Sequence, residues 1–133
     1  MNGQKTISRT TDGIKISVEP TYQPNHSRPL HNKYMFSYRI SIENDSTFTV
    51  QLLWRHWFIY DSNATLRAVD GEGVIGELPI LSPGETHEYE SWCELMTDLG
   101  KMYGYYTFVR QTDGEQFKVM IPEFQLVDPT KLN

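Results

Sequence analysis

The sequence predicts an all-β fold, a sandwich of about seven antiparallel strands. The first observation is a period of two, because apolar and polar residues alternate over several stretches, as in a strand with one buried face. The second is the regular placement of Gly, Pro, Asn, Asp and Ser between those stretches. No segment carries a convincing helical stripe. Many short strands with regular turns are typical of a β-sandwich or a small closed sheet.

Alternating stretches define six or seven expected strands. In the longest, the even-numbered residues from Tyr34 to Ile42 are apolar and most of the odd-numbered ones are polar. Turn signals such as Asp12-Gly13 and Asp113-Gly114 precede or separate the stretches. The main expected strands cover residues 14–18, 34–42, 50–59, 86–92, 103–110 and 117–121.

Two breaks in the alternation predict irregularities within strands. The inward face passes from even residues at Leu52 to odd residues at Trp57, so a β-bulge is expected near Leu53–Arg55. A second break follows Ile121, where Pro122 cannot donate a hydrogen bond to a neighbouring strand.

The chain has the length of one domain, residues 1–133, with an ordered core expected at about residues 12–128. Residues 1–11 and 128–133 are expected to be loose at the two ends. One helical turn is expected at Cys93–Asp98, so helix should make up less than about 10% of the chain. The expected core residues are Tyr34, Phe36, Tyr38, Ile40, Val50, Leu52, Trp57, Tyr105, Val119 and Ile121.

Charge and composition exclude several classes of protein. The net charge is -5, and residues 68–100 contain eight acidic residues and no Lys or Arg. An acidic chain without a basic cluster is a poor ligand for nucleic acid, whose phosphates supply most of the affinity. No apolar run approaches the roughly 20 residues that span a bilayer. A single cysteine excludes an internal disulfide, and we expect a cytoplasmic protein without membrane insertion.

Residues 71–76 spell Gly-Glu-Gly-Val-Ile-Gly, the GxGxxG pattern of dinucleotide-binding turns. In that fold a helix follows, but here two prolines lie within seven residues and no helical pattern appears. The favoured interpretation is therefore a connection whose glycines need positive φ or close packing. The alternative is an anion site in which backbone N–H groups of Gly71, Gly73 and Gly76 hold a phosphate without a helix.

Three carboxylates flank the same glycines, at Asp70, Glu72 and Glu77. They would repel a bare pyrophosphate unless a divalent cation bridges them to it. These residues are therefore weak candidates for metal ligands, with magnesium or cobalt as the ion. No cofactor is otherwise expected.

Arg55 is the most informative single charge, because it stands in an aromatic stretch between Trp54 and Trp57. The favoured interpretation is an arginine stacked on an aromatic ring and paired with a carboxylate of a strand. The functional alternative is a contact with an anion or a partner. Cys93 has no cationic neighbour in sequence and is expected to be a small buried apolar residue. The four histidines show no zinc-site spacing and are expected at the surface.

An ordered set of short motifs resembles the ApaG family from about Ile14 to Pro129. Each motif is weak alone, whereas the set in this order is highly specific. Leu78 departs from the family pattern, which usually has Gln at that position. The motifs are Val50-Gln51-Leu52, Arg55-x-Trp57-x-Ile59-x-Asp61, Gly71-Glu72-Gly73-Val74-Ile75-Gly76-Glu77-x-Pro79, Leu81-x-Pro83-Gly84-Glu85, Gly100-x-Met102-x-Gly104-x-Tyr106 and Phe117-x-Val119-x-Ile121-Pro122-x-Phe124.

The resemblance implies a fibronectin-type-III-like sandwich, in agreement with the strand pattern. It also implies a link to cobalt and magnesium resistance, which is a phenotype and assigns no molecular activity. Similar domains occur in eukaryotic F-box proteins and in a DNA-polymerase-δ-interacting protein, as protein-binding modules. A pyrophosphate or nucleotide role is associated with the GxGxxG segment.

Three functions are therefore open. The first is a non-enzymatic binding module that contacts an unidentified protein partner. The second is a pyrophosphate- or nucleotide-binding protein that uses residues 71–76, with a divalent cation. The third, least favoured, is a hydrolase of phosphoanhydrides that uses a cation held by Asp70, Glu72 or Glu77. No GxSxG, Ser-x-x-Lys or P-loop motif supports catalysis.

Overall fold

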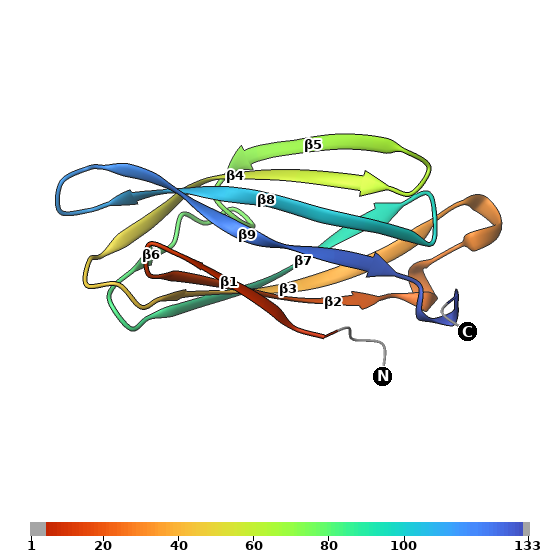
Figure 1. Cartoon of the computed structure of the whole chain (residues 1–133), viewed down its shortest axis with the longest axis horizontal. Helices are drawn as coiled ribbons and strands as arrows, with labels where there is room; N and C mark the ends of the chain where they lie inside the picture. The colour runs from red at the N-terminus through yellow and green to blue at the C-terminus, as the bar shows by residue number, and fades with distance from the viewer. Residues whose placement is uncertain (1–4, 132–133) are drawn as a thin grey trace.

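The computed structural model describes residues 5–131, and they fold into two antiparallel β-sheets with no α-helix (Figure 1). Three single 3-10 turns are present: η1 (Pro24–His26), η2 (Pro29–His31) and η3 (Pro129–Lys131). The strands are β1 (Ile7–Thr11), β2 (Ile14–Tyr22), β3 (Tyr34–Asn44), β4 (Val50–Asp61), β5 (Thr65–Glu72), β6 (Ile80–Leu81), β7 (Thr86–Leu95), β8 (Leu99–Arg110) and β9 (Gln116–Val127).

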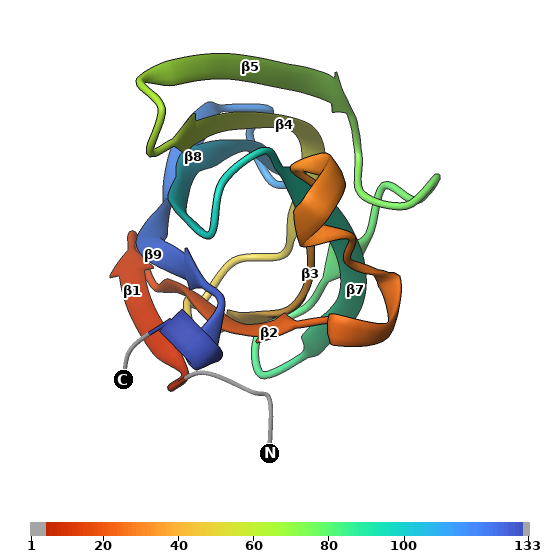
Figure 2. The ribbon, with the colours of Figure 1, turned by 90° about the vertical axis from the view of Figure 1, so that its right-hand side faces the viewer.

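The first sheet has the strand order β1-β2-β3-β7, and the second has the order β5-β4-β8-β9 with β6 also paired to β4. Figure 2 shows the two sheets facing each other across the interior. Seven long strands, three in one sheet and four in the other, form an immunoglobulin-like or fibronectin-type-III-like sandwich. The predicted fold class is confirmed, and the short strands β1 and β6 are additions to it.

Several predicted boundaries are wrong. Residues 7–11, expected to be loose, form β1 because they pair with Ile14–Val18 of β2. The helical turn expected at Cys93–Asp98 is absent, since β7 continues to Leu95. Asp128 at the other end is buried, and its side chain accepts hydrogen bonds from Thr130. The expectation for residues 1–4 and 132–133 lies outside the described residues.

Both predicted irregularities are present. The pairing of β4 with β8 shifts register between Leu52 and Trp54, where Leu53 is the extra residue. The pairing of β8 with β9 shifts between Met102 and Gly104, opposite the Pro122 segment. The first bulge matters for the site, because it turns Arg55 to the same face as Trp57.

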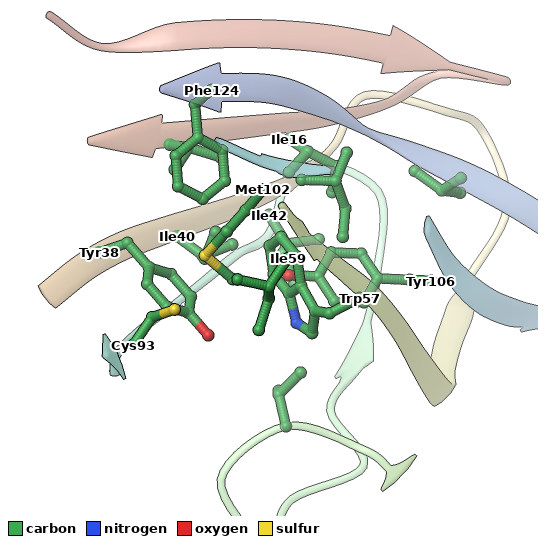
Figure 3. Close-up of a cluster of buried hydrophobic side chains, with 14 of the residues drawn as sticks. Ile16, Tyr38, Ile40, Ile42, Trp57, Ile59, Cys93, Met102, Tyr106 and Phe124 are labelled. Carbon is green, nitrogen blue, oxygen red and sulfur yellow. The ribbon is translucent and has the colours of Figure 1, made fainter. Parts of the chain in front are cut away.

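The core lies between the two sheets and is rich in aromatic and branched side chains (Figure 3). Phe36 and Leu52 have no exposed surface, and Trp57 is 3% exposed. Nine of the ten expected core residues are buried. The exception is Tyr105, which is half-buried on the outer face and stacks on His56, while its neighbour Tyr106 occupies the core.

The two open sides of the sandwich differ. On one side β9 lies beside β1 (Figure 2). There the Met120 amide donates a 3.2 Å hydrogen bond to Thr11 Oγ1. On the other side β5 and β7 are the last strands of their sheets, and no strand of the described residues pairs with their outer edges. A groove lies between these two edges.

Candidate functional site

The groove between β5 and β7 contains two adjoining cavities of about 260 and 240 Å³. We call the pair the edge groove. Four residues line both cavities: Tyr38 from β3, Arg55 and Trp57 from β4, and Ser91 from β7. The first cavity adds Arg67 and Cys93 among others, and the second adds Glu72 and the turn at residues 74–76. The edge groove therefore brings together residues from both sheets.

Arg55 lies at the junction of the two cavities. It is opposite Gly71 in the β4–β5 register, and its guanidinium covers the glycine so closely that a Cβ there would lie 2.5 Å from its Cζ. Its Nη1 donates to the backbone oxygens of Glu72 at 3.0 Å and Gly73 at 2.9 Å. The expected carboxylate partner is not there, because no described Asp or Glu forms an ion pair with Arg55.

Neutral hydroxyl groups face the same space. Burial raises the pKa of Tyr38, against the opposing effects of a hydrogen bond with Ser91 and the nearby Arg55 charge. Burial likewise raises the pKa of Tyr89 and of Tyr106, whose hydroxyls are 2.5 Å apart. These phenols are therefore protonated at every physiological pH and act as hydrogen-bond donors or acceptors, not as charges.

Arg67 of β5 lines the first cavity. Its Nη2 donates to the Glu94 backbone oxygen at 2.6 Å and lies 3.6 Å from Cys93 Sγ, so the side chain bridges the two sheets. The thiol of Cys93 is buried, as expected. Burial raises its pKa to about 11, with the Arg67 charge acting in the opposite direction.

Cys93 is therefore expected to react slowly with iodoacetamide in the folded protein. At about pH 8 the raised pKa leaves very little thiolate, and the thiolate is the reactive form. The rate should rise with pH towards about 11 and should increase strongly once guanidinium chloride unfolds the chain. Mass spectrometry of timed samples measures it, and equal rates for folded and unfolded protein would contradict the prediction.

The glycine segment is a tight turn that uses its own backbone donors. The Gly73 amide donates to Leu53 O, and the amides of Val74 and Glu77 donate to each other's carbonyl oxygens. Ile75 and Gly76 at the tip both have positive φ. The side chain of Val74 is 1% exposed and belongs to the core. Gly71 and Gly73 thus meet Arg55, whereas Gly76 forms the wall of the second cavity.

The three candidate metal ligands do not converge. Asp70 forms a 2.7 Å hydrogen bond with His56 Nδ1 on the outer face of β5, and Glu77 lies 3.5 Å from His87 Nε2. Of the three, only Glu72 lines the edge groove. No group of three or more His, Cys, Asp or Glu side chains within the described part of the chain is placed to hold a metal ion.

A larger cavity of about 500 Å³ lies at the end of the sandwich, near the β3–β4 and β8–β9 connections. Its cation, Arg110, is already paired with Asp113 at 2.6 Å and Glu115 at 2.7 Å and covers the Phe48 ring. That arginine holds the pKa of the Asp113 carboxyl at about 2. With its charge satisfied, this cavity is a weaker candidate than the edge groove.

Arg55 and the glycines could be identified from the sequence, but Tyr38, Ser91, Arg67 and Tyr89 were missed as site residues. Ser91 and Tyr89 come from β7, which follows Arg55 at a distance along the chain and lies in the opposite sheet. No sequence motif marks these residues, because the spacing of residues along the chain does not show which positions meet when two sheets pack across a core.

The described residues therefore form a small immunoglobulin-like β-sandwich domain with a groove between its β5 and β7 edges. The family profile described as the ApaG domain matches residues 24–110. The chain is 44% identical over 122 residues to Protein ApaG of Brucella canis, covering 92% of this chain and 93% of that protein. It is 45% identical over 119 residues to Protein ApaG of Sinorhizobium fredii, covering 90% and 91%. The chain belongs to the ApaG family.

Solved structures agree with this assignment. A crystal structure of an ApaA protein from Bordetella pertussis is 39% identical, with a TM-score of 0.85 over 92% of this chain and 98% of that one. The C-terminal domain of wzt is 12% identical with a TM-score of 0.53, a likeness of fold alone. Across the described residues we find no helix with the length and apolar character needed to traverse a membrane.

Proposed function

We propose that this protein is a non-enzymatic binding module that contacts another protein through the edge groove. The observation that carries the proposal is the pair of strand edges, β5 and β7, that flank the groove without a neighbouring strand among the described residues. An extended segment of a partner can add to such an edge through main-chain hydrogen bonds. Val69 and Trp92, which are 40% and 46% exposed beside the groove, supply apolar contact area.

The chemistry of the groove supports binding over catalysis. Two side chains in the groove could act as nucleophiles. They are Ser91, whose hydroxyl is hydrogen-bonded with Tyr38, and Cys93, whose thiol has a raised pKa. No histidine of the described chain is among the residues that line either cavity, so neither group has an imidazole base beside it. The cobalt and magnesium phenotype associated with the family would then act through a partner, and the acidic surface disfavours nucleic acid in that role.

Site-specific photo-crosslinking in cells tests this proposal. A photoreactive residue at position 69 faces the groove, whereas one at position 66 on the same strand faces away from it, and both native side chains are exposed. We expect position 69 to give discrete protein adducts that position 66 does not give. The same adducts from both positions, or none from either, would contradict the proposal.

A second candidate, pyrophosphate or nucleotide binding, is favoured by Arg55, which forms no ion pair with a described Asp or Glu and lies beside the Gly76 turn. Against it, the Gly73, Val74 and Glu77 amides already donate to protein oxygens. A bridging divalent cation would depend on Glu72, since Asp70 and Glu77 face other partners. Calorimetry with pyrophosphate and with nucleotides, each with and without magnesium, tests this candidate, and no heat in any condition would remove it.

Turnover assays with magnesium, manganese or cobalt test the third candidate, the phosphoanhydride hydrolase.

A further inference from the structure

We propose that the Arg55 end of the edge groove binds a single carboxylate carried by an extended segment of the partner, with basic residues beside that carboxylate. The inference rests on the proposed function and names the chemistry of the partner. It assigns the recognition to the Arg55 side chain and the surrounding hydroxyls instead of to the glycine amides.

The guanidinium of Arg55 has donors left for a ligand. Its hydrogen bonds with the described residues are the two from Nη1 to the Glu72 and Gly73 oxygens. These bonds hold the planar group in place, while Nε and Nη2 keep their protons beside two cavities. A guanidinium edge presents two parallel N–H groups, which match the two oxygens of a carboxylate.

The neighbouring hydroxyls add donors without adding charge. Tyr38 and Ser91 share one hydrogen bond, so the pair has one further proton to offer. The same holds for Tyr89 and Tyr106, of which Tyr89 lines the second cavity. A ligand that only accepts hydrogen bonds suits this surface, and an ionised carboxylate is such a ligand.

The charge of the surroundings selects a monoanion over a polyanion. Among the described residues Arg55 is the cation of the second cavity, and the turn beside it lies in a stretch with eight acids and no Lys or Arg. Attraction to Arg55 and repulsion from Glu72 both grow in proportion to the ligand charge, so the two effects offset each other for either ligand. The cost of taking the ligand out of water rises more steeply with its charge, so it opposes pyrophosphate more than one carboxylate. Basic residues on either side of the carboxylate would meet Glu72 in one cavity and Glu94 in the other.

The shape of the groove favours an extended occupant. The two cavities share four lining residues, so they lie next to each other along β5 and β7, whose outer edges pair with no strand of the described residues. A strand places alternate side chains on the same face, which allows a central acidic residue to face Arg55 while its neighbours on the other face stay outside.

Titration with two matched peptides, followed by NMR, tests the inference. The probe is acetyl-Val-Lys-Thr-Glu-Thr-Lys-Val-amide, in which both lysines lie on the same strand face as Glu, and its control carries Gln in place of Glu. We expect the Glu peptide to shift the Arg55 Nε–H signal and the Val69 and Ser91 amides, and to bind about tenfold more tightly than the Gln peptide, as expected for a charge-assisted pair. Equal affinities, or no binding of either peptide at about 5 mM, would overturn the inference.

Two variants of equal charge make the test specific. Arg55→Gln should abolish the preference for Glu, whereas Arg39→Gln, which removes the same charge from an exposed position that lines neither cavity, should keep it. Arg55→Lys keeps the charge but loses the two parallel N–H donors of the guanidinium, so it should retain only part of the preference for the Glu peptide. Should Arg55→Gln fail to fold, the inference is tested by the affinities of the Glu and Gln peptides for the native chain and by the reduced preference expected for Arg55→Lys.

The two proposals can fail separately. Adducts from position 69 together with equal binding of the two peptides would leave the proposed function standing and reject the carboxylate. Preference for the Glu peptide without adducts would leave the carboxylate site and reject the protein-binding role. Displacement of the Glu peptide by an equal concentration of pyrophosphate in metal-free buffer would show that the site prefers the polyanion, and would also overturn the inference.

Discussion

Replacing Phe36 with Ala is expected to lower the free energy of unfolding by about 3–5 kcal/mol. Phe36 has no exposed surface, and its ring lies 5.3 Å from that of Tyr22 in the first sheet. Truncation removes the buried ring and leaves a space that the surrounding strands cannot fill completely. Urea or guanidinium chloride denaturation followed by tryptophan fluorescence measures the change.

Phe48→Ala is the matched control, because the same side chain is removed from a site that is 42% exposed. We expect it to cost about 1 kcal/mol or less, since the ring is already in contact with water and its cation contact is with Arg110 at the surface. A loss below about 1 kcal/mol for Phe36→Ala would show that the inward face of β3 is assigned wrongly.

Gly73→Ala is expected to be the most damaging change in the glycine segment, with a loss of about 2 kcal/mol or more. Gly73 has φ +62°, where an alanine is strained, and a Cβ there would lie 2.1 Å from the Glu77 carbonyl oxygen. That oxygen accepts the hydrogen bond of the Val74 amide, so it cannot move without opening the turn. Thermal or chemical denaturation measures the loss.

Gly76→Ala separates the effect of backbone strain from the effect of a steric clash of the added Cβ. Gly76 has φ +73°, but apart from its two chain neighbours no described residue has an atom within 4 Å of the position that a Cβ would take. Only the backbone strain of roughly 1 kcal/mol therefore applies. In the structural interpretation, partner binding by Gly73→Ala falls only as far as its stability does. Weakened pyrophosphate binding by a fully stable Gly73→Ala would instead support a phosphate held by the glycine amides.

The sheet assignment could be predicted where one face is buried, because burial imposes the period of two. Phe36 and Ile40 in β3 are examples, and both have no exposed surface. Strand β5 was not predicted, because it is an edge strand whose residues are nearly all exposed, so no buried face imposes an alternation on its sequence. In β8 both faces are covered by aromatic rings, so the alternation could not tell the outward Tyr105 from the inward Tyr106.

The site was predictable only in part. The phase change around Leu53 indicated that Arg55 faces inward, and the bulge confirms it. The expected carboxylate partner was wrong, because Arg55 is held by the backbone oxygens of Glu72 and Gly73, which no sequence pattern displays. The hydroxyls of Tyr38 and Ser91 reach the same place from the opposite sheet, and that proximity depends on how two sheets pack across a core.

The bridge from Arg67 to the Glu94 carbonyl has a consequence for colloidal behaviour. An uncovered edge strand is a template on which a second chain can nucleate a fibril. By occupying a carbonyl of β7, Arg67 removes one of the acceptors that a docking strand of another copy would use. The glutamates of the same strand, Glu88 and Glu90 among them, add repulsion between copies. Replacing Arg67 should therefore shorten the lag time of aggregation in concentrated solution markedly and should have only a small effect on the melting temperature.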